Sequence, residues 1–192
     1  MLIGITLDLH PLIFILLYLI LVLGVYIFYY LKKRPSQKKF FIMLAFIFYC
    51  LVLFKLTILP ITILFEDQGD YSYLYYQIIP FASISKFASS NLKLFIIQVL
   101  GNFLLLIPLP IFYNILINDK RKTTLKKNII LIIFTSLFIE VTQLCINKLT
   151  KVPNKVADID DLMLNILGGI FGYLMFYLIQ KFKNKYLTHH TK

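Results

Sequence analysis

The sequence contains no tryptophan, only two cysteines and few acidic residues. Cys50 and Cys145 stand alone in or near the ends of apolar segments, without the spacing of metal ligands, so we expect both to be buried as small hydrophobic side chains. Without tryptophan, the aromatic residues at a membrane interface must be tyrosine and phenylalanine, which number 13 and 18. Only 9 acidic residues oppose 20 basic ones, so the formal net charge is +11.

Several signatures of chemistry are also missing. The sequence shows no nucleophile with its base, no His-Glu-x-x-His zinc motif and no phosphate-binding loop, which disfavours the corresponding enzymes. It has no soluble basic domain, so nucleic acid is not an expected partner. Asp158, Asp160 and Asp161 are close in sequence, but three carboxylates without further ligands are a weak metal signal, and we expect neither a metal nor a cofactor.

What remains is strongly apolar. Hydrophobic residues make up 59% of the 192 residues, and the mean hydropathy is +0.81, which is too apolar for a soluble domain. The apolar runs are about 20 residues long, the length that crosses the hydrocarbon core as a helix. We therefore predict an all-α, polytopic membrane helix bundle, a single membrane domain over residues 1–192, with five spans at about 9–31, 40–64, 93–117, 128–147 and 160–180.

A proline in the second span and the composition of one connection refine this prediction. Pro60 is expected to kink or end the second helix. The longest connection, 65–92, is rich in aromatic residues, and we expect it to lie at the interface with a short helix.

The basic residues predict the orientation. Asp8 and His10 precede the first span and Lys32 follows it, the reverse of a secretory signal, so we expect an uncleaved anchor. The loops 32–39 and 118–127 and the C-terminal tail hold 14 of the 20 basic residues. Because basic loops stay in the cytoplasm, the N-terminus is predicted outside and the C-terminus inside.

Polar residues interrupt the spans at similar depths. Charged groups inside a membrane usually face a bundle interior or a wet cavity, because hydrocarbon solvates them poorly. At a helix rise of about 1.5 Å per residue, several of them lie roughly 8 to 14 Å from the outer helix ends. This favours one outward-facing polar pocket, with the candidate ligand-pocket residues Glu140, Gln143, Asp158, Asp161, Asn165, Asn102 and Lys55.

Helical spacing agrees with that pocket, although structural roles compete with it. Ser136, Glu140, Gln143 and Asn147 follow steps of four, three and four, which is one face of a helix. Alternatively, Glu140 forms an ion pair with Lys55 or a hydrogen-bonded bridge between spans. The aspartates, Asp158 foremost, can cap the fifth helix or suit its positive end. Gly168 and Gly172 form a small-xxx-small step that permits close helix approach.

These segments resemble the VanZ-like family of bacterial membrane proteins. The matching pieces are LTILP at 56–60, IIPF at 78–81, GNFLLLIPL at 101–109, IEVTQ at 139–143 and ADIDDLMLNILGGIFGY at 157–173, a core of about 55–180. The family positions fall on Asn102, Pro108, Glu140, Gln143, Asp158, Asp161 and Asn165. Two positions depart from the pattern. Pro110 replaces a glycine, and Lys155 replaces an arginine, whose bidentate grip lysine cannot reproduce.

The resemblance implies a multi-pass protein of the bacterial cell membrane, linked in its named member to low-level resistance against the glycopeptide teicoplanin. Three functions compete. The first is a binding protein whose outward pocket holds an amphiphile, either a lipid-linked envelope precursor or a lipoglycopeptide tail. The second is an intramembrane enzyme with Glu140 as acid or base, which the absence of known catalytic motifs disfavours. The third is a small transporter, which an odd span count and the lack of inverted repeats disfavour.

Overall fold

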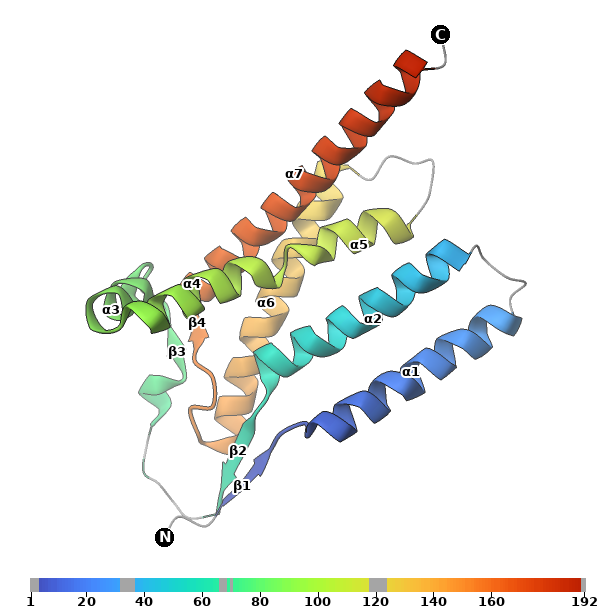
Figure 1. Ribbon diagram of the computed structural model, residues 1–192. Coiled ribbons are helices and arrows are strands. Elements are labelled where there is room, and N and C mark those ends of the chain that lie inside the picture. The colour runs from blue at the N-terminus through green and yellow to red at the C-terminus, as the bar shows by residue number, and fades with distance from the viewer. Residues whose placement is uncertain (1–3, 32–36, 66–68, 70, 118–123, 191–192) are drawn as a thin grey trace. The chain divides into compact units, whose positions relative to one another are not determined.

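A computed structural model describes residues 4–31, 37–65, 69, 71–117 and 124–190, with side chains through residue 185. Within these residues it is mostly helical (Figure 1). Five helical stretches are long and apolar enough to cross a membrane: Pro11–Leu31, Gln37–Ile58, Leu92–Leu116, Leu125–Thr150 and Ile159–Lys185. They match the five predicted spans, and the chain is a multi-pass membrane protein.

The chain divides into two compact units. The first comprises Met1–Ile78 and Phe138–Asp158, and the second comprises Ile79–Leu137 and Ile159–Lys192. Helix α6 (Leu125–Thr150) thus contributes its C-terminal half to the first unit and its N-terminal half to the second.

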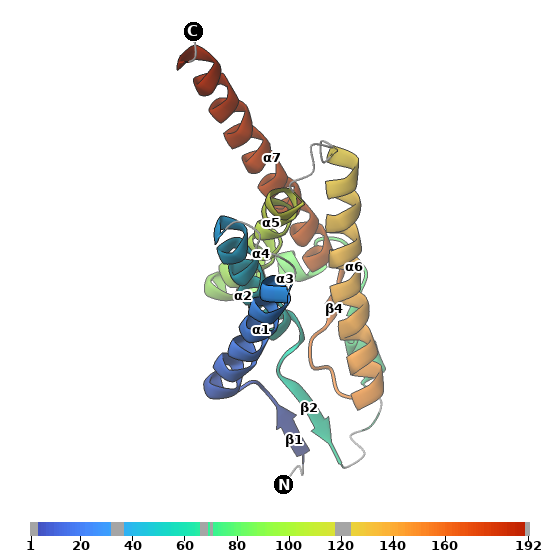
Figure 2. The ribbon, with the colours of Figure 1, turned by 90° about the vertical axis from the view of Figure 1, so that its right-hand side faces the viewer.

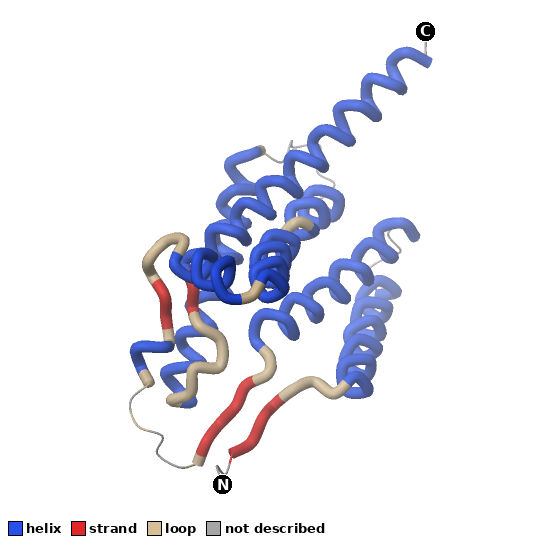
Figure 3. The backbone as a smooth tube through the Cα atoms, turned by 60° about the vertical axis from the view of Figure 1, so that its left-hand side comes forward, coloured by secondary structure: helices blue, strands red, loops and turns tan. Residues whose placement is uncertain are grey.

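In the first unit, α1 (Pro11–Leu31) and α2 (Gln37–Ile58) run antiparallel side by side (Figures 1 and 3). Their contact is aromatic: the Phe14 and Tyr18 rings meet Phe48 edge-on, at centroid distances of 6.0 and 5.6 Å. Strand β1 (Gly4–Leu7) precedes α1 and strand β2 (Ile61–Leu64) follows α2, and the two form an antiparallel pair (Figure 2).

The second span is shorter than predicted because α2 ends at Ile58 and the chain continues as strand β2. Proline has no N–H to donate and pushes the preceding residue towards extended backbone, so Pro60 closes the helix. The following Ile-Thr-Ile-Leu is dominated by β-branched residues, which favour a strand. The expected end at Pro60 is confirmed, whereas the expected helix through residue 64 is wrong.

The first unit contains a second pair of strands. Following the short 3₁₀ helix η1 (Ser72–Leu74), β3 (Tyr76–Gln77) pairs in parallel with β4 (Ala157–Asp158). Figure 3 shows both strand pairs in red among the helices. The all-α prediction is therefore too narrow, because connections outside the helices pair their backbone groups with each other.

In the second unit, the short helix expected in the 65–92 connection is present as α3 (Ala82–Ser90), and α4 (Leu92–Leu105) follows it. The position of this connection at the membrane interface stays a prediction. The third span is then broken, and α5 (Pro108–Leu116) begins at Pro108. Because Pro108 cannot donate a backbone hydrogen bond, the Ile107 N–H closes a tight turn onto the Leu104 carbonyl at 3.3 Å. The polar pair Asn114 and Asn128 links α5 to α6 at 2.8 Å.

Glycines let α7 (Ile159–His190) approach the broken span closely. A Cβ on Gly168 would lie 1.7 Å from the Phe103 carbonyl oxygen, and one on Gly172 would lie 2.1 Å from that of Ile107. No side chain fits at such distances, so the predicted close approach at the small-xxx-small step is confirmed.

Large hydrophobic side chains are exposed along the helices, and α1 has no buried residue. Such a surface suits lipid and not water. Cys145 is exposed and Cys50 is half-buried, so the expected burial of Cys145 is wrong. An outward-facing cysteine costs little where the surroundings are apolar. Residues 32–36 and 118–123, which carry much of the two basic loops, lie outside the described residues.

Candidate functional site

The polar face predicted for the fourth span is present on α6 and is buried. Ser136 and Asn147 are fully buried, and Glu140 and Gln143 are each 8% exposed, whereas the neighbouring Val141 is 55% exposed. Burial of this face follows from its spacing, since steps of three and four align side chains on a helix. We call Glu140, Gln143 and Asn147, all in the first unit, the α6 polar group.

Glu140 holds the segment that precedes α7. Its Oε2 accepts a hydrogen bond from the backbone N–H of Asp158 at 2.8 Å, across 18 residues of sequence. Both residues are buried, so this bond lies away from water, where a hydrogen bond is electrostatically stronger than at the surface. Glu140 therefore has a structural role, which joins the fourth span to the connection before the fifth. The bridge between two spans stays a prediction.

Gln143 and Lys155 donate hydrogen bonds to backbone carbonyls at the C-terminal end of α2. The last carbonyls of a helix lack partners within it. The Gln143 Nε2 donates to the Thr57 carbonyl at 2.9 Å, and the Lys155 ammonium donates to the Leu56 carbonyl. A cation there also suits the negative end of the helix dipole. The other polar atom of Gln143, Oε1, is buried and has no hydrogen-bond partner among the described residues.

Asn147 and Asn154 shape the connection between α6 and β4. The Asn147 Nδ2 donates to the Lys155 carbonyl at 2.7 Å, and its Oδ1 accepts from the Asn154 N–H at 2.9 Å. The Asn154 side chain pairs with both backbone groups of Thr62, at 2.6 and 3.2 Å. These amides fix the polar loop beside Glu140 and tie it to β2. Asn154 was not among the predicted site residues, although a Pro-Asn step is a known turn signal.

Lys55 lies in the last turn of α2 and faces α1. Its ammonium donates to the Leu9 carbonyl at 3.0 Å and lies 6.0 Å from the Phe14 ring centroid. Within the part of the chain that the structure describes, Lys55 makes no ion pair with Glu140. The proposed Lys55–Glu140 pair is thus not formed.

In the second unit, Asp160 caps α3. Its carboxylate accepts three backbone N–H groups, from Phe81 at 2.5 Å, Ser83 at 3.0 Å and Ile84 at 3.1 Å. Phe81 has a left-handed φ of 64° and precedes α3 directly. A residue 76 to 79 positions away thus supplies the cap that the helix lacks locally. Asp160 was expected to suit the positive end of the fifth helix, and its backbone partners at α3 were not readable from spacing.

The other polar residues of the second unit lie on α4 and α7. The Gln98 Nε2 donates to Asp161 Oδ1 at 2.6 Å, which joins the two helices. Asn165 is 1% exposed, and its Oδ1 has no partner among the described residues. Asn102 is half-buried on α4, one turn beyond Gln98. Asp158 is the residue directly before α7, where the capping prediction places it.

The structure thus brings together Glu140 with the Asp158 backbone, and Gln98 with Asp161, within separate units. A single pocket formed by all seven candidates stays a prediction. The described residues contain no group of three His, Cys, Asp or Glu side chains arranged to hold a metal ion. These side chains can form hydrogen bonds with a ligand, chiefly as acceptors through carboxylate and amide oxygens.

Comparison with known proteins identifies the chain at the level of its family. No curated protein matches it, and no solved structure does. The model of the VanZ/LLP1 family matches residues 46–180, which include every polar residue of α6 and α7 described above and exclude α1. The match covers most of the chain and the recognised motifs, so the protein belongs to the VanZ/LLP1 family.

Proposed function

We propose that this membrane protein acts in the bacterial cell envelope, where it lowers susceptibility to teicoplanin-type glycopeptides by binding an amphiphilic or lipid-linked ligand. The choice of glycopeptides is supported by the resemblance to a family whose named member is linked to teicoplanin resistance. The buried α6 polar group supports binding, because polar side chains inside a span are more often functional than those at its ends.

One observation carries the proposal. The Gln143 Oε1 is buried without a partner among the described residues, one helical turn from the Glu140 carboxylate. Leaving a buried acceptor unsatisfied costs about 1–3 kcal/mol, which a ligand that supplies a donor would recover. Carboxylate and amide oxygens both accept hydrogen bonds, so the ligand is expected to present hydroxyl or amine groups there.

The proposed orientation fits this ligand. With the N-terminus outside, the C-terminal half of α6 lies in the outer half of the membrane, where envelope precursors and antibiotics arrive. A lipid-linked molecule would keep its chain in the hydrocarbon and offer its polar end to Glu140 and Gln143.

The test is the glycopeptide susceptibility of a sensitive bacterial host that expresses each variant at matched membrane level. Glu140→Gln keeps an oxygen that can accept the Asp158 N–H, so the fold should persist while the charge is lost. Asp161→Asn likewise keeps an oxygen for Gln98. Both variants should lose the protection that the parent chain gives. Thr142→Val, which removes only a hydroxyl bonded to its own helix at Phe138, is the matched control.

Protection by both charge variants at the parental level would show that the carboxylates are structural. Absence of protection by the parent chain, with the protein present in the membrane, would contradict the resistance role.

A further inference from the structure

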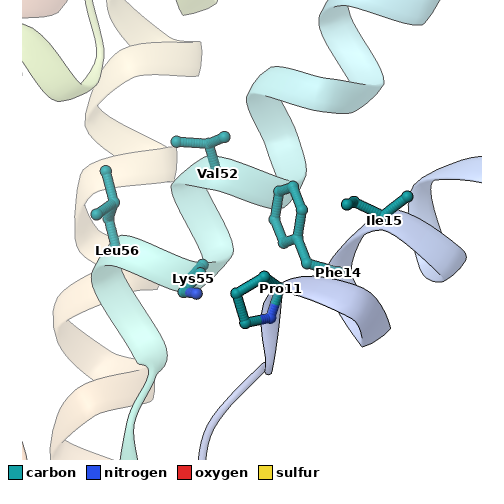
Figure 4. A pocket seen from close by; sticks show the side chains of 6 residues that line it. All are labelled: Pro11, Phe14, Ile15, Val52, Lys55 and Leu56. Atoms are coloured by element: carbon teal, nitrogen blue, oxygen red, sulfur yellow. The ribbon is translucent and has the colours of Figure 1, made fainter.

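A groove lies between α1 and α2, apart from the α6 polar group. It has a volume of about 320 Å³ and is lined by Pro11, Phe14, Ile15, Val52, Lys55 and Leu56. Figure 4 shows the Phe14 ring standing between the two helices, with the Lys55 amine near Pro11 at the end where α1 begins. Five of the six lining residues are apolar, and Lys55 is the one that carries charge.

The Lys55 ammonium has more N–H donors than acceptors among the described residues. An ammonium carries three N–H donors, and within the described residues only the Leu9 carbonyl accepts from it. The Asp8 carboxylate, next to Leu9, accepts the Leu9 N–H at 2.7 Å, and among the described residues no carboxylate is paired with Lys55. Holding a cation at an apolar groove is costly without a counter-charge, and a ligand with an anionic oxygen would supply one.

We propose that this groove binds one anionic phospholipid, with its phosphate at Lys55 and an acyl chain along Phe14, Ile15 and Val52. A phospholipid combines the two features that the lining requires, an anionic acceptor and an apolar chain. The position of Lys55 agrees, because the last turn of a spanning helix lies near the headgroup region. The groove shares no residue with the α6 polar group, and its α1 wall falls outside the segment that matches the family, whereas Val52, Lys55 and Leu56 lie within that segment.

Native mass spectrometry of the purified full chain in detergent tests the proposal. The probes are a phosphatidylglycerol, a glucosyl diacylglycerol with the same acyl chains and no phosphate, and inorganic phosphate. The parent should bind one phosphatidylglycerol, and neither of the other probes should compete for it. Lys55→Met should weaken that binding roughly tenfold, the effect of losing a charged hydrogen bond, and Lys55→Arg should retain it. Lys148→Met, at an exposed position in the last turn of α6, is the matched control and should bind as the parent does.

A second variant tests the apolar wall without touching the charge. Val52→Phe fills the groove and should also weaken binding, while thermal melting confirms that each variant is folded. Equal binding by Lys55→Met and the parent would overturn the proposal. Competition by the glucolipid at equal strength would show that charge plays no part, and competition by phosphate alone would show a simple anion site; either would overturn it as well.

Discussion

Glu140 and Gln143 each hold another segment of the chain by a hydrogen bond to its backbone. Their positions inside an apolar span were readable from sequence because a carboxylate there is costly. Their partners were not, since both are backbone groups, the Asp158 N–H and the Thr57 carbonyl. Any residue type supplies such groups, so side-chain spacing carries no signal for them.

Lys55 and Glu140 should act independently, because their partners differ. In a double-mutant cycle with Lys55→Met and Glu140→Gln, we expect the changes in unfolding free energy to add within about 0.5 kcal/mol. The measurement is thermal or denaturant unfolding of the purified protein in detergent. A coupling above roughly 1 kcal/mol would mean that the two charges do neutralise each other.

Asp160→Ala should loosen α3. The substitution leaves three backbone N–H groups without their acceptor, so amide hydrogen exchange at Ser83 and Ile84 should accelerate by roughly tenfold or more. Asp161→Ala is the matched control, because that carboxylate contacts Gln98 on α4 instead. Unchanged protection in Asp160→Ala, read by exchange mass spectrometry, would show that α3 is held by other contacts.

At the scale of elements, apolar length predicted the five spans well, because a helix must be about 20 residues long to cross the hydrocarbon. The break between α4 and α5 and the end of α2 depend on single prolines, whose presence was visible but whose local geometry was not. The strand pairs were missed altogether. Each pairs residues far apart in sequence, such as Tyr76 with Ala157. Strands of two residues, as in β3 and β4, or of four, as in β1 and β2, are too short for a clear periodic pattern.

The contact of α7 with the broken span depends on glycine. Gly168→Ala should destabilise the protein by about 1–3 kcal/mol, because its methyl group would overlap the Phe103 carbonyl. Gly101→Ala on α4 is the control, since a Cβ there meets nothing within 4 Å. Melting temperature in detergent and the amount of protein in the membrane are the measurements. Equal stability of the two variants would contradict the close packing.

At the scale of the whole molecule, the spans and their basic loops predict the orientation. A cysteine at Tyr73, in the connection between the second and third spans, should react with an impermeant maleimide on intact cells. A cysteine at Thr124, before α6, should react only after lysis. Both positions are exposed, and the test is made in a chain whose Cys50 and Cys145 are replaced by alanine. The opposite pattern of labelling would show that the chain has the inverse orientation in the membrane.

We propose that the α6 polar group binds a ligand and does not transform it. The most direct measurement incubates the purified protein in nanodiscs with labelled lipid II, a lipid-linked envelope precursor, and follows bound and released label. We predict saturable binding without turnover, weakened roughly tenfold by Glu140→Gln and unchanged by Thr142→Val. Release of a water-soluble product would show an enzyme, and the absence of saturable binding would contradict the ligand assigned to this group.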